Sequence, residues 1–133
     1  LQTYFRAKTL ERSIIVTDAV SAAGKHLSPG FYDIGDVKIE RHQDGTVRIP
    51  GSMYLAGSSV TMDQMVRNLI NWYDFSIDDI LLMARENPKP IVKGFVSDPS
   101  IGVPANLVHW HHRDGELHVR ETSIGPWTIR PQY

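Results

Sequence analysis

Cysteine is absent from the 133 residues of this chain. Its absence excludes disulfide bonds, thiolate nucleophiles and metal centres held by cysteine, and it suits a reducing compartment. Long apolar runs are lacking as well, so the sequence contains no candidate for a bilayer-spanning helix. Arg6, Lys8 and Arg12 interrupt the N-terminal stretch, which therefore lacks the apolar core of a signal peptide. We expect a cytoplasmic protein without a membrane partner.

An excess of either charge is also missing. Fourteen Lys and Arg residues stand against 15 Asp and Glu residues, which leaves a formal net charge of -1. Neither sign forms a run that could follow a phosphate backbone, so we expect no nucleic-acid partner. With 41% hydrophobic and 22% charged residues, the composition is that of an ordinary globular protein, and the length allows at most one domain.

A short β-branched run, Ser13-Ile14-Ile15-Val16-Thr17, is typical of a strand buried on both faces of a parallel sheet. Asp18 stands at its C-terminal end. Such a strand needs neighbours on both edges, and the sequence offers no other strand of this kind. The chain also begins at Leu1 rather than Met. We therefore expect a piece of a longer protein that supplies the rest of the sheet.

The remaining sequence alternates between strand and helix patterns. Residues 31–50 alternate around Asp44-Gly45 and predict a β-hairpin. Apolar residues at helical spacing predict a helix over 61–73, with Thr61 and Gln64 as a capping box. Ser76 and Asp79 form a second box, and a second helix follows it until Asn87-Pro88. The C-terminal strands are expected at 106–112, 117–121 and 127–129.

Three segments, in this order and spacing, are together characteristic of one enzyme family: Ile15-Val16-Thr17-Asp18-Ala19 with Ala22-Ala23-Gly24, Leu55-Ala56-Gly57-Ser58, and Thr61-Met62-Asp63-Gln64 with Val66-Arg67-Asn68-Leu69. On these segments the chain resembles the N-acetylglucosamine-6-phosphate deacetylases of the amidohydrolase superfamily. The likeness runs from residue 7 to residue 88, with a weaker echo at 102–108. Each motif alone is ordinary, whereas their ordered combination is specific.

The resemblance implies an α/β fold, namely a distorted (β/α)₈ TIM-like barrel with a small β-sandwich domain. Residues 1–95 would be the C-terminal part of the barrel domain, with its last strand, the following helices and a β-hairpin excursion at 31–50. Residues 96–133 would be the C-terminal strands of the sandwich. Catalytic groups of such barrels lie at the C-terminal ends of the strands, where the sequence has Asp18.

The family hydrolyses the acetamide of N-acetylglucosamine 6-phosphate to glucosamine 6-phosphate and acetate, a step in amino-sugar catabolism. The resemblance implies a divalent metal, zinc or similar, that polarises the amide carbonyl, with Asp18 as the catalytic acid/base. Leu55, Ala56 and Gly57 would bind the sugar. The family's principal metal ligands come from earlier strands, so this chain contains none of them and would be inactive alone. The complete enzyme is expected to be a homodimer.

Other interpretations of these residues have to be weighed. A carboxylate that ends a strand is usually a turn former or a helix cap, and Leu55-Ala56-Gly57 could simply lead into the next helix. Gly57-Ser58-Ser59 lacks a base that would make a serine nucleophilic, so its hydroxyls are better explained as caps. His109 and His111 share one strand face, but the resemblance assigns them to the sandwich, so we interpret them as surface imidazoles rather than metal ligands.

Two functional alternatives also stay open. The chain could be a non-catalytic binding or scaffold module derived from the same family. It could also belong to an amidohydrolase with a different substrate, although the Leu-Ala-Gly-Ser and Thr-Met-Asp-Gln segments argue against this.

Overall fold

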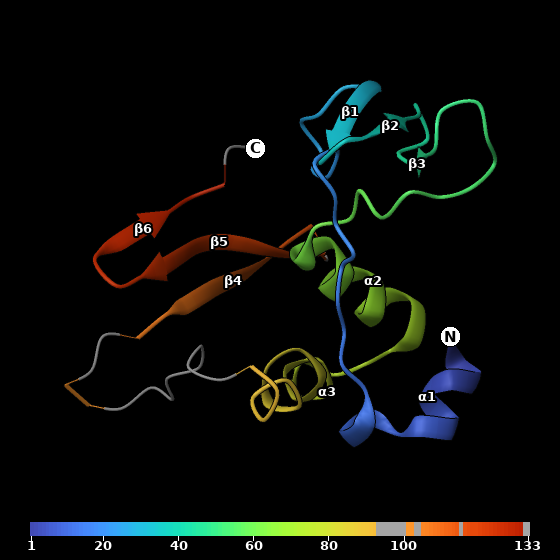
Figure 1. Ribbon diagram of the computed structural model, residues 1–133. Coiled ribbons are helices and arrows are strands. Elements are labelled where there is room, and N and C mark those ends of the chain that lie inside the picture. Colours follow the sequence, from blue (N-terminus) through green and yellow to red (C-terminus); the bar gives the residue numbers. More distant parts are fainter. Residues whose placement is uncertain (93–100, 103–104, 115, 132–133) are drawn as a thin grey trace. The chain divides into compact units, whose positions relative to one another are not determined.

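The computed structural model describes residues 1–92, 101–102, 105–114 and 116–131. In these ranges it contains two three-stranded antiparallel sheets and several helices (Figure 1). The chain divides into two compact units. One unit is Ile15–Val66, and the other combines Leu1–Ile14 with Arg67–Tyr133. None of the described helices is both long enough and apolar enough to cross a bilayer.

The sheet of the first unit is a meander of β1 (Gly30–Ile34), β2 (Val37–Arg41) and β3 (Val47–Arg48). The predicted reversal at Asp44-Gly45 is confirmed between β2 and β3. The prediction of a single hairpin is incomplete, because Ile34 pairs with Val37 and a second tight turn separates β1 from β2. Gly35 permits this turn with a φ of 56°, a value that other residues rarely adopt.

The core of this unit is small. Ala22, Ile39 and Val47 are buried, and the half-buried residues Val20, Tyr32 and Ala56 pack against them. Val20 and Ala56 come from the two segments that the sequence marks as functional. The core therefore anchors both segments, through Val20 near Asp18 and through Ala56, which is itself a predicted sugar-binding residue.

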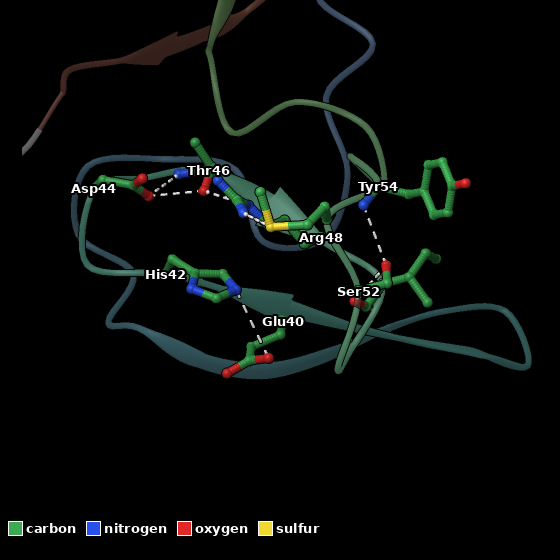
Figure 2. A network of polar contacts seen from close by, with 9 residues as sticks. Glu40, His42, Asp44, Thr46, Arg48, Ser52 and Tyr54 are labelled. Atoms are coloured by element: carbon green, nitrogen blue, oxygen red, sulfur yellow. Dashed lines mark hydrogen bonds and ion pairs between the residues drawn. The ribbon is translucent and has the colours of Figure 1, made fainter.

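Polar contacts stabilise the turn between β2 and β3 (Figure 2). The Asp44 carboxylate accepts hydrogen bonds from the Thr46 hydroxyl at 2.7 Å and the Thr46 amide at 2.9 Å. Arg48 Nε donates to the same hydroxyl oxygen at 3.3 Å, and His42 Nε2 lies 3.7 Å from Glu40 Oε2. These two bonds hold the pKa of Asp44 below its usual value, and the bond from the Thr46 hydroxyl has the larger effect. Asp44 thus stabilises the turn.

Residues 13–17, expected as a buried strand of the complete barrel, do not form a strand in this chain, so that assignment stays a prediction about the complete enzyme. Residues 13–18 form neither helix nor strand, and the side chains of Ile14 and Val16 are 41% and 68% exposed. The reason is that the segment has no ladder partner among the described residues. An apolar run without neighbouring strands leaves its side chains and its backbone polar groups open to water.

We expect this exposed run to make the purified chain self-associate, because solvent-exposed apolar residues and free backbone groups favour pairing with another copy. Sedimentation velocity should show a mass that rises with protein concentration. Val16→Lys should lower this association, whereas Val37→Lys, at another exposed valine of the same unit, should change it little. A monomer whose mass does not depend on concentration would contradict the prediction.

The second unit begins with a helix that the sequence patterns did not indicate, α1 (Gln2–Lys8), followed by the short 3₁₀ turn η1 (Leu10–Arg12). The ring of Phe5 packs edge-on against Tyr73 and Phe75, at centroid distances of 5.9 and 5.1 Å. Asn87 Nδ2 donates to the carbonyl oxygens of Leu10 and Ser13 at 2.7 and 2.6 Å. These contacts are long-range, so local periodicity did not reveal the segment.

Both predicted helices are confirmed. They are α2 (Met62–Tyr73), which runs across the boundary between the units, and α3 (Ile77–Leu81), which continues into the π-helical turn η2 (Leu82–Glu86). The Ser76 capping box is also confirmed. Asp79 N donates to Ser76 Oγ at 3.1 Å, and Ser76 N donates to Asp79 Oδ2 at 2.9 Å.

The C-terminal meander is confirmed as well. It consists of β4 (Leu107–Arg113), β5 (Glu116–Ile124) and β6 (Trp127–Ile129), with β5 in the centre. The register between β4 and β5 shifts at His109/Trp110. The expected domain boundary at 95/96 and residues 103–104 of the weaker motif echo lie outside the described residues. The division into 1–95 and 96–133 therefore stays a prediction about the complete enzyme.

Candidate functional site

The two segments singled out in the sequence, around Asp18 and around Gly57, lie side by side in the first unit. Ser58 N donates to the Asp18 carbonyl oxygen at 2.8 Å, and Val20 N donates to the Ser58 carbonyl oxygen at 3.0 Å. These two bonds form an isolated parallel bridge between Ala19 and Ser58. A polar site can form here because two segments distant in the sequence meet at this bridge.

The segment Leu55–Ser58 has β3 on its other side. Ala56 N donates to the Val47 carbonyl oxygen at 2.9 Å, and Leu55 forms an antiparallel bridge with Arg48. The segment thus connects the meander to the residues that follow Asp18. Its position is determined by backbone hydrogen bonds on both sides, and the side chain of Leu55 stays exposed to solvent.

Asp18 is exposed and has a left-handed backbone conformation, with a φ of 51°. Aspartate tolerates this region better than most residues. Its carbonyl is bound by Ser58, while its carboxylate has no hydrogen-bond or ion-pair partner among the described residues. A carboxylate held by its own backbone and open to solvent is suited to accept and return a proton.

Gly57 also lies beside this backbone. Its φ is 86°, and a Cβ atom added to it would lie 2.3 Å from Val20 Cγ1 and 3.2 Å from the Asp18 carbonyl oxygen. Neighbouring Leu55 is 67% exposed, and Ala56 packs on the core. The structure therefore places Gly57 beside Asp18, while Leu55 and Ala56 lie in the same segment against β3. The contact of all three predicted sugar-binding residues with a ligand stays a prediction.

The serines after Gly57 have structural contacts. Ser58 Oγ accepts a hydrogen bond from Val60 N at 2.9 Å, and the Ser59 hydroxyl donates to the Gly45 carbonyl oxygen at 2.6 Å. Both hydroxyls thus bind backbone groups of their own unit. This agrees with their interpretation as local caps rather than nucleophiles.

One histidine of β4 has a carboxylate directly beside it. His109 Nδ1 lies 3.2 Å from Glu121 Oε1, and Arg130 Nε donates to Glu121 Oε2 at 3.2 Å. His111 pairs with His118 of β5, with ring centroids 5.9 Å apart. A cavity of about 390 Å³ is lined here by His111, Arg113, Asp114, Glu116 and His118. Cross-strand register, which local sequence does not reveal, produced these neighbours.

Within residues 1–92, 101–102, 105–114 and 116–131, no three His, Asp or Glu side chains are close enough together to hold a metal ion. Among the described residues, the Asp18 carboxylate is not part of any group of three possible metal ligands. The described residues therefore do not fit a complete metal centre, at Asp18 or on the C-terminal sheet.

We expect His109, His111 and His112 of β4 not to bind zinc stoichiometrically. Glu121, the carboxylate beside His109, is already paired with Arg130, and no three metal-ligating side chains cluster in the described part of the chain. Isothermal titration of the chain with zinc should show only weak binding. A His109→Ala/His111→Ala variant, in which both imidazoles are removed, should give the same titration curve. Tight one-to-one binding that this variant loses would overturn the prediction.

Comparisons with known proteins agree on one group of enzymes, although no family model matches the chain. The chain is 29% identical over 125 residues to N-acetylglucosamine-6-phosphate deacetylase of Lysinibacillus sphaericus. This match covers 87% of the chain and 31% of the relative. It is 31% identical over 116 residues to N-acetylgalactosamine-6-phosphate deacetylase of Escherichia coli O157:H7. That match covers 86% of the chain and 29% of the relative. The chain thus spans less than a third of the length of these two relatives.

A solved structure also resembles the chain over nearly its full length. It is an aspartate-to-alanine mutant of N-acetyl-D-glucosamine-6-phosphate deacetylase from Mycobacterium smegmatis in complex with N-acetyl-D-glucosamine-6-phosphate. The identity is 25% and the TM-score 0.78, over 98% of this chain and 34% of the other. Together these matches confirm the resemblance read from the motifs: the chain is homologous, over most of its length, to part of the N-acetylglucosamine- and N-acetylgalactosamine-6-phosphate deacetylases.

Proposed function

We propose that this chain is part of a metal-dependent deacetylase that hydrolyses the acetamide of N-acetylglucosamine 6-phosphate to glucosamine 6-phosphate and acetate. The observation that carries the proposal is the pairing of Asp18 with the Leu55–Ser58 segment through the Ser58 amide. It joins an exposed carboxylate to a backbone segment with an exposed leucine. Proton transfer and ligand contact would then occur at one place.

In this proposal the Asp18 carboxylate is the acid/base. It accepts a proton from the water whose oxygen attacks the acetamide carbonyl carbon. It then returns that proton to the amide nitrogen as the C–N bond breaks, so that acetate and the free amine leave. The carboxylate suits this exchange because it is exposed and carries no competing ion pair within the described part of the chain. Leu55, Ala56 and Gly57 would contact the sugar.

The metal, zinc or similar, is proposed to be held by residues other than those described, which contain no adequate ligand set. The residues around Ser13–Thr17 would become the last strand of a (β/α)₈ barrel once neighbouring strands cover them. The exposure of Ile14 and Val16 supports this, because apolar side chains of this kind are buried in parallel sheets. We further propose that the complete enzyme is a cytoplasmic homodimer. It would bind a small amino-sugar phosphate and have no nucleic-acid or membrane partner.

The test joins this chain to the remaining part of the Lysinibacillus sphaericus relative, in place of the third of that protein to which it corresponds. Release of free amine from N-acetylglucosamine 6-phosphate should appear in the joined enzyme and be absent from the chain alone. A folded joined enzyme that binds the substrate without turnover would favour a non-catalytic module.

A second substrate has a specific observation in its favour. The relative with the higher identity of the two described above is an N-acetylgalactosamine-6-phosphate deacetylase. The same assay should therefore compare the two sugar phosphates, which differ only in the configuration at C4. A higher kcat/KM for the galactosamine derivative would assign that substrate instead.

A further inference from the structure

Gly57 differs from the other glycines that the structure describes. Among the described glycines, an added Cβ atom would approach another heavy atom to within 3.0 Å only at Gly57, where Val20 Cγ1 would be 2.3 Å away. Gly51 also has a positive φ, of 72°, but no atom lies within 4 Å of its Cβ position. Gly51 thus requires only backbone freedom, whereas Gly57 also requires an empty space beside Val20.

That space lies at the bridge that holds Asp18. Ser58 N, which follows Gly57 directly, donates to the Asp18 carbonyl oxygen, and the Gly57 Cβ position is 3.2 Å from the same oxygen. Ala19 N adds a hydrogen bond to Thr17 Oγ1 at 3.2 Å. The carboxylate of Asp18 has no such bond among the described residues. Its location therefore depends on where the backbone of Asp18 is held.

We propose that Gly57 is a positioning residue for Asp18, in addition to any contact it makes with the sugar. The absence of a side chain lets the segment 57–58 approach residues 18–20 closely enough for the Ser58 amide to bind the Asp18 carbonyl. A methyl group would push the two segments apart through Val20 and displace the carboxylate. This inference rests on the proposed function of Asp18 as the acid/base.

The test uses four variants of the joined enzyme: Gly57→Ala, Val20→Ala, the Gly57→Ala/Val20→Ala double variant, and Gly51→Ala as the control with a similar φ and open space. Displacement of a catalytic group by about 1 Å costs about 10²-fold in rate. Gly57→Ala should therefore lower kcat by about that factor with little change in KM. The double variant should recover most of the kcat of Val20→Ala, because Val20 Cγ1 is removed. Gly51→Ala should keep the parent kcat.

A second measurement does not depend on turnover. Hydrogen exchange of the Ser58 amide in the chain should accelerate in Gly57→Ala and return toward the parent rate in the double variant, because the bond to Asp18 weakens and is then restored. An inactive parent enzyme would refute the proposed function while this exchange still decides the positioning.

Three results would overturn the inference. A raised KM with unchanged kcat in Gly57→Ala would make Gly57 only a ligand contact. Equal losses in Gly57→Ala and the double variant would show that Val20 is not the obstacle. Unchanged Ser58 exchange in Gly57→Ala would show that the backbone pairing does not need glycine.

Discussion

Asp18→Asn in the joined enzyme is expected to lower kcat for deacetylation by about 10²- to 10⁴-fold, the range that general acid–base groups supply. The amide keeps the shape of the side chain but cannot accept a proton from water. The backbone bond from Ser58 N to the Asp18 carbonyl does not involve the side chain, so the fold should persist. Turnover, metal content and substrate affinity are to be measured on one preparation, and affinity should change little.

Asp33→Asn is the matched control for this experiment. Asp33 is an exposed aspartate of β1 in the same unit, and it should leave turnover unchanged. An Asp18→Asn enzyme within a few-fold of the parent would remove Asp18 from the proposed mechanism. Loss of both metal and fold would instead make the role of Asp18 structural.

Ile39→Ala is expected to destabilise the unit Ile15–Val66 by about 2–5 kcal/mol, the range for buried isoleucine truncated to alanine. Ile39 has no exposed surface and lies in the small core on which Val20 and Ala56 pack. Hydrogen exchange of amides bonded within this unit should report the loss, in particular His42 N, which donates to Thr46, and Ala56 N, which donates to Val47. Both should exchange faster by a similar factor.

Ile34→Ala provides the comparison for the core variant. Ile34 is 40% exposed on the neighbouring strand β1, so the same truncation removes less buried surface and should cost much less. Equal acceleration of exchange in both variants would contradict the assignment of Ile39 to the core. If the Ala56 amide exchanges faster in Ile39→Ala but not in Ile34→Ala, this core also stabilises the segment beside Asp18.

Several features followed from the sequence because they depend on neighbours a few residues away. The apolar spacing over 61–73 predicted α2, and Ser76 with Asp79 predicted the cap of α3. Asp44-Gly45 predicted a chain reversal, and the strand-like runs near the C-terminus predicted β4, β5 and β6. The motif order also identified the homologous enzymes before any comparison.

The tertiary structure alone decided which distant residues meet. The bond from Ser58 to Asp18, and the steric requirement at Gly57 that accompanies it, bring two separated motifs together. His109 pairs with Glu121 beside the register shift at His109/Trp110. The spacing of the histidines in the sequence did not predict this pair. The exposure of Val16 likewise depends on which strands surround it. The period of a helix and its caps are encoded within one or two helical turns of sequence. The register between strands, and the space available to a side chain, depend on segments that are far apart in the sequence, so the local sequence does not reveal them.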